Sequence, residues 1–281
     1  MRSKTVSLTL LLSLAVLAAR LGADVDKYEI YAVRYATLAG FKVSSLVAGA
    51  DPARQLDIAM MFWALKGIDG RLAIVDCGFH REQYFRQFRV KDFILPSDAV
   101  ALLGLRSENV TDLIVSHMHW DHAGGMDLFP NARVWIQKEE YDYYAGDAWQ
   151  SRNTHGGIDP EDVMEIVKRN MAGKVSFIRG DDETTISGIT FNIGGKHTWQ
   201  SQYVTVQTPK STVVIASDNM YLYENLDTHK PIAQTLDAVS NLRAQDRMRS
   251  LASEPRLVIP GHDPAVFDRF PRVSDRVVRI E

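Results

Sequence analysis

One short segment, HMHWDH at residues 117–122, constrains the fold and the chemistry of this chain more than any other stretch. It follows the mainly apolar residues 113–116, which predict a buried strand, and it precedes the turn residues Gly124 and Gly125. Imidazole and carboxylate groups are ligands of divalent transition metals, and a loop at the end of a strand can direct several of them at one point. We therefore predict a metal site; a polar turn rich in histidine is the alternative interpretation.

Residues 1–23 have the pattern of a secretory signal peptide. Two basic residues precede an apolar run at 6–19, and every acidic residue comes after position 23. The apolar run is short for a membrane-spanning helix, and no stop-transfer pattern follows it. We expect cleavage after Ala23, or alternatively after Ala19, and a periplasmic or secreted protein without stable membrane insertion. An uncleaved membrane anchor is the other interpretation.

The net charge of the chain argues against a nucleic-acid partner. The formal charge of the whole sequence is −3, and residues 1–23 contain three basic residues and no acidic one, so their removal leaves −6. A protein that binds a phosphate backbone normally carries a basic face. We therefore expect no nucleic-acid partner.

Hydrophobic periodicity predicts two strand-rich halves. In the first half, strands are expected at 28–36, 41–48, 56–66, 72–75, 113–116 and 131–137, and helices at 79–93, 97–105, 138–144 and 161–170. In the second half, strands are expected at 175–178, 184–186, 189–193, 203–208, 212–217 and 256–259, and a helix at 231–250. No linker or repeat separates the halves. Residues 24–281 are therefore predicted to form a single α/β domain, a four-layered αββα sandwich.

Three further candidate ligands, His197, Asp218 and His262, each lie just beyond a predicted strand. Strands that end at one edge of a sheet sandwich bring the residues that follow them together. The predicted ligands are His117, His119 and His197 for one metal ion and Asp121, His122 and His262 for a second, with Asp218 shared between the two. Two ions about 3.5–4 Å apart lower the pKa of a water and stabilise developing negative charge, which is a mechanism for hydrolysis.

In these residues the chain resembles the metallo-β-lactamase-fold hydrolases, whose motif H-x-H-x-D-H stands at residues 117–122. The later members of the family pattern match His197, Asp218 and His262, so the resemblance covers nearly all of residues 24–281. It implies hydrolysis at two divalent metal ions. The ligand types favour Zn²⁺ as the first choice, and iron, manganese or cobalt also suit mixed imidazole and carboxylate ligands. The family hydrolyses β-lactams, thioesters, lactones and phosphodiesters on one scaffold, so the fold alone does not give the substrate.

Within the family, the chain looks like the N-acyl homoserine lactonases, which destroy quorum signals. A shared aspartate such as Asp218 is unlike the β-lactamases proper, and Tyr221 lies three residues after it, as in the lactonases. There the tyrosine hydroxyl supports the oxyanion of the lactone. The resemblance therefore implies a lactone substrate and two catalytic residues, Tyr221 and Asp121, with Asp121 passing a proton to the departing alkoxide. Alternatively, Tyr221 packs under the following helix, with Tyr223 two positions away.

Several features leave the substrate and the assembly open. Trp199 and Gln200 stand where related lactonases commonly have a glycine. Residues 60–63, Tyr143, Tyr144 and Trp149 are candidates for an apolar groove that holds an acyl chain, and residues 46–61 for a homodimer contact. A β-lactamase or a broad carboxylic-ester or thioester hydrolase is the alternative enzyme, and a metal-binding module without catalysis is the alternative from another class.

Overall fold

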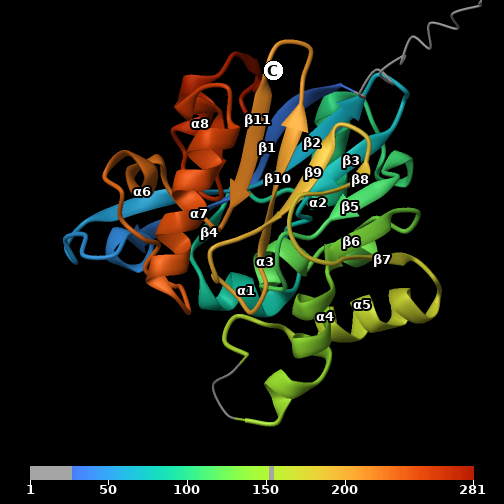
Figure 1. Cartoon of the computed structure of the whole chain (residues 1–281), viewed down its shortest axis with the longest axis horizontal. Helices are drawn as coiled ribbons and strands as arrows, with labels where there is room; N and C mark the ends of the chain where they lie inside the picture. The colour runs from blue at the N-terminus through green and yellow to red at the C-terminus, as the bar shows by residue number, and fades with distance from the viewer. Residues whose placement is uncertain (1–26, 152–154) are drawn as a thin grey trace, which may run out of the picture.

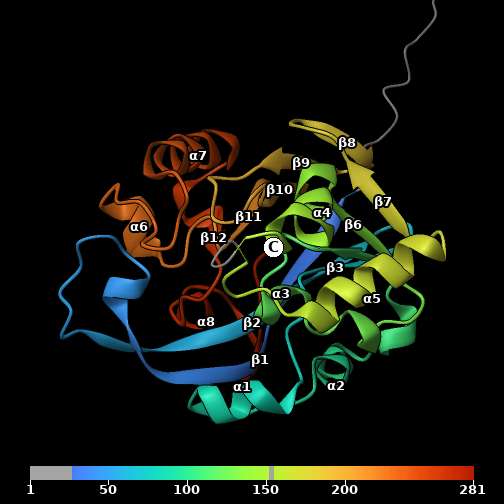
Figure 2. The same ribbon diagram turned by 90° about the horizontal axis from the view of Figure 1, so that it is seen from below.

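A computed structural model describes residues 27–151 and 155–281 of the protein. The predicted signal peptide, residues 1–23, lies outside the described residues. Within the described ranges, no helix combines the length and the apolar composition needed to cross a membrane. Two β-sheets pack face to face, and helices cover both outer faces (Figure 1, Figure 2). The predicted four-layered αββα sandwich is confirmed.

The larger sheet has nine strands, in which the long antiparallel pair β1 and β2 is followed by parallel strands. Its order is β13 (Arg272–Ser274), β14 (Val277–Arg279), β1 (Tyr28–Lys42), β2 (Gln55–Gly67), β3 (Leu72–Val75), β5 (Asp112–Ile114), β6 (Arg133–Gln137) and β7 (Val175–Ile178), with β4 (Val90–Lys91) paired to β1. The smaller sheet has the order β12 (Val258–Pro260), β11 (Thr212–Ser217), β10 (Gln202–Gln207), β9 (Ile189–Ile193) and β8 (Glu183–Ile186).

Two apolar clusters hold the layers together. One contains buried residues of both sheets, such as Trp63 of β2 and Phe191 of β9, and extends to the helices α6 (Tyr223–Asp227), α7 (Ala238–Leu251) and α8 (Val266–Arg269). The other lies between the outer face of the larger sheet and the helices α1 (Glu82–Gln87), α2 (Pro96–Val100), α4 (Lys138–Ala145) and α5 (Pro160–Met171). The short helix α3 (Trp120–Ala123) lies within the histidine-rich segment.

One predicted strand is wrong, and two predicted helices are shorter than expected. Residues 41–48 do not form a separate strand: β1 continues through bulges to Lys42, where Phe41 still pairs with Leu56 of β2, and a 3-10 turn follows. The helix predicted at 79–93 is confined to α1, since β4 pairs with β1. The helix predicted at 97–105 gives way after α2 to a 3-10 turn that ends at Gly104, whose φ is +71°.

The helix predicted at 231–250 begins only at Ala238. The side chain of Asp237 accepts hydrogen bonds from two backbone N–H groups of the first turn, which defines the helix start. The preceding residues form an irregular segment, and Leu236 is 65% exposed although its spacing suggests a helix core. Helix α6 and the β13–β14 hairpin are absent from the sequence prediction.

The apolar residues of two predicted surfaces are buried inside the chain itself. Residues 60–63 are at most 2% exposed, so they belong to the core and the prediction of a groove there is wrong. In the stretch 46–61, Leu46, Val47 and Ile58 are also buried in the core. The homodimer contact stays a prediction.

Candidate metal centre

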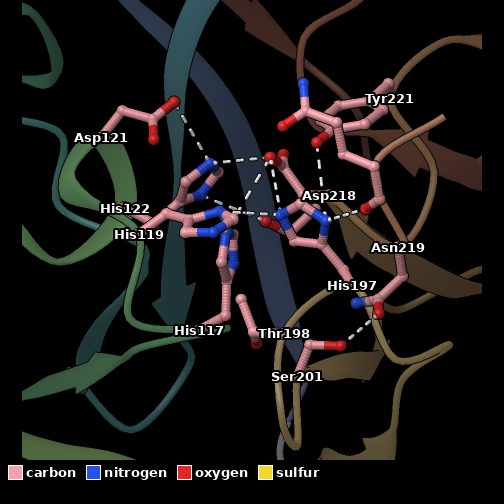
Figure 3. A network of polar contacts seen from close by, with 12 residues as sticks. His117, His119, Asp121, His122, His197, Thr198, Ser201, Asp218, Asn219 and Tyr221 are labelled. Carbon is pink, nitrogen blue, oxygen red and sulfur yellow. Dashed lines mark hydrogen bonds and ion pairs between the residues drawn. The ribbon is translucent and has the colours of Figure 1, made fainter. Parts of the chain in front are cut away.

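The first predicted ligand group converges where β5 and β10 approach each other. Nδ1 of His119 lies 3.0 Å from Nε2 of His117 and 2.9 Å from Nε2 of His197. Oδ2 of Asp218, just after β11, lies 3.5 Å from Nε2 of His197 and 3.9 Å from Nε2 of His117. Figure 3 shows these side chains turned toward one another from separate segments. All four offer a ligand atom within 4.8 Å of the others.

The second predicted group lies on the other side of Asp218. Nε2 of His122 and Nε2 of His262 are each 3.5 Å from Oδ2 of Asp121. Asp218 reaches this group as well, with Oδ2 at 3.3 Å from Nε2 of His122 and Oδ1 at 3.1 Å from Nε2 of His262. The structure therefore brings all seven predicted side chains together, with Asp218 between the two groups.

Hydrogen bonds on the outer side of the imidazoles fix which nitrogen faces inward. Nδ1 of His197 lies 2.8 Å from the carbonyl oxygen of Gln234, and Nδ1 of His262 lies 3.0 Å from that of Ala59. A carbonyl oxygen can only accept, so both Nδ1 atoms donate, and in the neutral ring this leaves the Nε2 atom with a lone pair directed at the cluster. This is the arrangement that metal-ligating histidines require.

Asp76 performs the same function for His122 and is a residue that the sequence analysis missed. Its Oδ2 lies 2.8 Å from Nδ1 of His122 and accepts hydrogen bonds from the hydroxyls of Ser116 (3.0 Å) and Ser217 (2.7 Å). Its Oδ1 accepts the backbone N–H of Ser116 at 2.8 Å. The Ser116 hydroxyl also lies 2.8 Å from Nδ1 of His117, so this carboxylate reaches both groups.

Burial keeps the histidines of the first group neutral, and neighbouring histidines keep Asp218 ionised. Burial lowers the pKa of His117 and His197, and it lowers the pKa of His119 to about 3. Burial alone would raise the pKa of Asp218, but His122 and His262 hold it well below its usual range. Neutral imidazoles and ionised carboxylates are the forms that bind a cation.

Two buried polar atoms support the fit of a cation. Nε2 of His122 and Oδ1 of Asp218 make no hydrogen bond within the described part of the chain, and their near polar neighbours, at 3.3 Å and 3.1 Å, are other members of the cluster. Buried polar groups are normally paired, and groups that are not have a functional explanation in many proteins. The converging lone pairs of nitrogen and carboxylate oxygen fit a divalent transition-metal ion.

Tyr221, and not Tyr223, faces this centre. The Tyr221 hydroxyl is 3.5 Å from Nδ1 of His197, and its ring stacks at 5.9 Å from the ring of His262. Burial raises its pKa well above the usual value, so the hydroxyl stays protonated. Tyr223 instead packs under the guanidinium of Arg269, which lies 3.7 Å from its ring centre.

Two clefts open onto the centre and meet at His119. The first has a volume of about 290 Å³, and it contains Asp121, Asp218, Tyr221 and His262 beside an apolar wall of Leu38, Phe41, Leu46, Ile58, Phe88 and Trp120. The second, of about 420 Å³, is lined by Tyr143, Tyr144, Trp199 and Leu236 beside His119 and His197. Of the predicted groove residues, Tyr143 and Tyr144 line the second cleft, whereas Trp149 stacks on His155 at 4.2 Å between ring centres.

Glu140 and Ser217, like Asp76, are residues near the centre that the sequence analysis missed, and their sequence signals are weak or absent. Asp76 has a weak sequence signal, because it directly follows the buried strand β3. Glu140 has none, because it stands in the run KEEYDYY, which reads as a solvated helix start. Its side chain is nevertheless fully buried.

Comparisons with known proteins agree on one family. Residues 62–262 match the metallo-beta-lactamase superfamily. An N-acyl homoserine lactonase of Bacillus cereus is 28% identical over 235 residues, which cover 78% of this chain and 87% of that protein. The N-acyl homoserine lactonase AttM of Rhizobium johnstonii is 26% identical over 186 residues, which cover 63% of this chain and 67% of that protein.

Solved structures agree at the level of the fold. A quorum-quenching N-acyl homoserine lactone lactonase has a TM-score of 0.68 at 21% identity, covering 85% of this chain and 93% of that one. AidC, a dizinc quorum-quenching lactonase in complex with a product, has a TM-score of 0.64 at 15% identity, covering 92% of this chain and 98% of that one. The superfamily match extends over more than half of the chain and includes all seven grouped side chains. The chain belongs to the metallo-β-lactamase superfamily and is a metal-dependent hydrolase.

Proposed function

We propose that this hydrolase opens the ester ring of lactones, and of N-acyl homoserine lactones in particular, and so destroys quorum signals. One observation carries the proposal: the Tyr221 hydroxyl lies in the wall of the cleft that contains Asp121 and Asp218 and has an apolar side. A protonated phenol beside a cation site suits a reaction in which a carbonyl oxygen gains negative charge. The names of the relatives, lactonases in Bacillus and Rhizobium, support the same substrate class.

We further propose that the centre holds two divalent ions, with Zn²⁺ as the first choice. The two ligand groups with Asp218 between them support two ions, as does the likeness to a dizinc lactonase. When bound, such ions lower the pKa of a water and stabilise negative charge on oxygen. The ligands would be His117, His119 and His197 for one ion and Asp121, His122 and His262 for the other, with Asp218 between them.

The chain's own residues would then position and protonate the substrate. Tyr221 donates its O–H to the lactone carbonyl oxygen, and this bond strengthens as water adds and the oxygen becomes an oxyanion. Asp121 holds the proton released by the attacking water at a carboxylate oxygen. When the bond between the carbonyl carbon and the ring oxygen breaks, Asp121 returns that proton to the alkoxide. The product is a hydroxy acid, which loses one proton at neutral pH.

The apolar wall of the first cleft would hold the acyl chain. Trp120 stands between two proposed ligands in sequence and stacks with Tyr84 (4.0 Å between ring centres) and Phe88 (5.0 Å). This stack provides a rigid apolar surface beside Asp121. An alkyl chain on that surface would gain about 0.8 kcal/mol for each buried methylene.

Proton release by the zinc-loaded chain tests the proposal. The substrates compared are a decanoyl homoserine lactone, γ-butyrolactone, a thioester and a β-lactam. We expect preferential opening of the acyl homoserine lactone, and Tyr221→Phe should lower its kcat about 10²–10³-fold, as loss of an oxyanion donor does. Tyr223→Phe is the matched control and should retain activity. Turnover of the β-lactam alone would refute the lactonase, and full lactone turnover by Tyr221→Phe would refute the role of its hydroxyl.

We also propose that the protein is exported, on the basis of the pattern in residues 1–23. N-terminal sequencing of the protein from a periplasmic fraction tests this. A mature chain that begins at Asp24 or at Arg20 would support export, whereas an intact N-terminus in the cytoplasm would contradict it.

A further inference from the structure

Glu140 is a buried carboxylate outside the ligand set that bonds to both segments of the first ligand group. It is the third residue of α4 and has no exposed surface. Its Oε1 accepts the backbone N–H of Met118 at 3.0 Å and the hydroxyl of Thr198 at 2.7 Å. Its Oε2 accepts the backbone N–H of Gln200 at 2.6 Å.

Two of these three donors stand directly beside histidines of the first group. Met118 stands between His117 and His119, and Thr198 directly follows His197. The two segments are far apart in sequence, yet their imidazole nitrogens must meet at about 3 Å, as they do around Nδ1 of His119. A side chain that holds both backbones sets the separation between those imidazoles.

A carboxylate suits this position better than an amide or an apolar side chain. All three neighbours donate, and a carboxylate is an acceptor at both oxygens. Burial raises the pKa of Glu140 to about 7, while the three hydrogen bonds and the positive charge of Lys196 oppose the rise. An amide would bring its NH₂ group against at least one N–H, and an apolar side chain would leave two backbone N–H groups unpaired.

We propose that Glu140 is a positioning residue that holds the segments of His117, His119 and His197 at the separation needed to bind a metal ion. It touches neither the ion nor the substrate. The inference rests on the two-ion part of the proposed function. Loss of a residue that orients metal ligands typically lowers metal affinity about 10–100-fold.

Cobalt titration of the metal-free chain tests this without any need for turnover. Visible absorption follows Co²⁺ binding, and competition with a chelator gives the two affinities. Titrations of His119→Ala and His262→Ala assign the spectrum of each ligand group. Glu140→Gln can keep two of its three hydrogen bonds, so we expect about a 10-fold loss at the first group, and about 100-fold in Glu140→Leu. The second group should keep its affinity in both variants.

Asp162→Asn is the matched control. Asp162 is the third residue of α5, is 1% exposed, and has a pKa raised by burial to about 7, but it pairs with Arg81 rather than with a ligand segment. Should Glu140→Leu fail to fold, Glu140→Gln and Thr198→Val carry the test. The proposal would be overturned if Glu140→Gln and Thr198→Val bound cobalt with unchanged affinity. It would also be overturned if both groups lost affinity equally and Asp162→Asn showed the same loss. Failure of the lactonase would appear separately, as absent turnover by a wild-type chain that binds both ions.

Discussion

Replacing Asp76 by Asn perturbs the network beneath the ligands by a single atom. In the native chain the Asp76 carboxylate accepts four hydrogen bonds, one at Oδ1 and three at Oδ2. The NH₂ group of asparagine can only donate. Placed at Oδ2, it would face the Nδ1–H of His122; placed at Oδ1, it would face only the backbone N–H of Ser116.

The second placement loses fewer bonds and sets the expected magnitude. It leaves one buried N–H without an acceptor, which costs about 1–3 kcal/mol of unfolding free energy. It also replaces the charged acceptor of His122 by a neutral one. Because a carboxylate behind a ligating histidine raises its basicity, we expect zinc affinity at the second group to fall about 10–100-fold.

The assay pairs two measurements on the same variants. Urea unfolding of the metal-free chain gives the loss of stability, and competition with a chelator gives the zinc affinity. Asp112→Asn is the control, because Asp112 is buried at the start of β5, at the end of the strand away from His117. Its carboxylate accepts hydrogen bonds from Trp135 (2.8 Å), Thr111 (2.7 Å) and Arg71 (3.2 Å). This variant should lose similar stability and keep its zinc affinity. Equal zinc affinities in Asp76→Asn and Asp112→Asn would refute the reasoning.

Three further outcomes are expected. Because the folded pKa of Glu140, about 7, exceeds the ordinary value of 4.5, the folded chain binds more protons between these pH values. Urea unfolding at pH 4.5 and at pH 8 gives the unfolding free energy of the metal-free wild type relative to that of Glu140→Gln. This difference should fall by about 3 kcal/mol from the lower to the higher pH, and no change would contradict the reasoning. Gly157 has a φ of +78°, and a Cβ there would lie 2.7 Å from His119 Cδ2, whereas Gly156 has open space. Gly157→Ala should lower kcat/KM for the decanoyl lactone at least about 10-fold while Gly156→Ala does not, since a small misplacement of a ligand is costly. Phe88→Ala should lower kcat/KM for the decanoyl lactone about 10-fold and leave γ-butyrolactone within about 2-fold, because only the former has an acyl chain to bury; equal losses would exclude the apolar wall.

The grouping of the seven candidate ligand side chains is predictable from sequence for a local reason. His117, His119, Asp121 and His122 are close because they share one loop, and the distant candidates each follow a strand. Strand ends converge at a sheet edge whatever the rest of the chain does. The same reasoning predicts the αββα layers, because the alternating patterns of the strands are strong.

The supporting residues are not predictable in this way. Asp76 and Glu140 are single acidic residues in segments whose other acids are solvated or unremarkable, and only tertiary packing buries them. The same limit explains why the helix predicted at 231–250 begins only at Ala238. Its first part is held in an irregular conformation because the carbonyl of Gln234 accepts the Nδ1–H of His197, an interaction that no local periodicity encodes.

The two buried carboxylates support different halves of the centre, and this separates their expected effects. Asp76 bonds directly to an imidazole of the second group, at His122, and reaches the first group only through the Ser116 hydroxyl. Glu140 bonds to no imidazole and acts through the backbone on either side of His117, His119 and His197. A direct bond transmits the loss of a charge more strongly than a path through an intervening hydroxyl that can rotate. Asp76→Asn should therefore weaken mainly the second ion, and Glu140→Gln mainly the first.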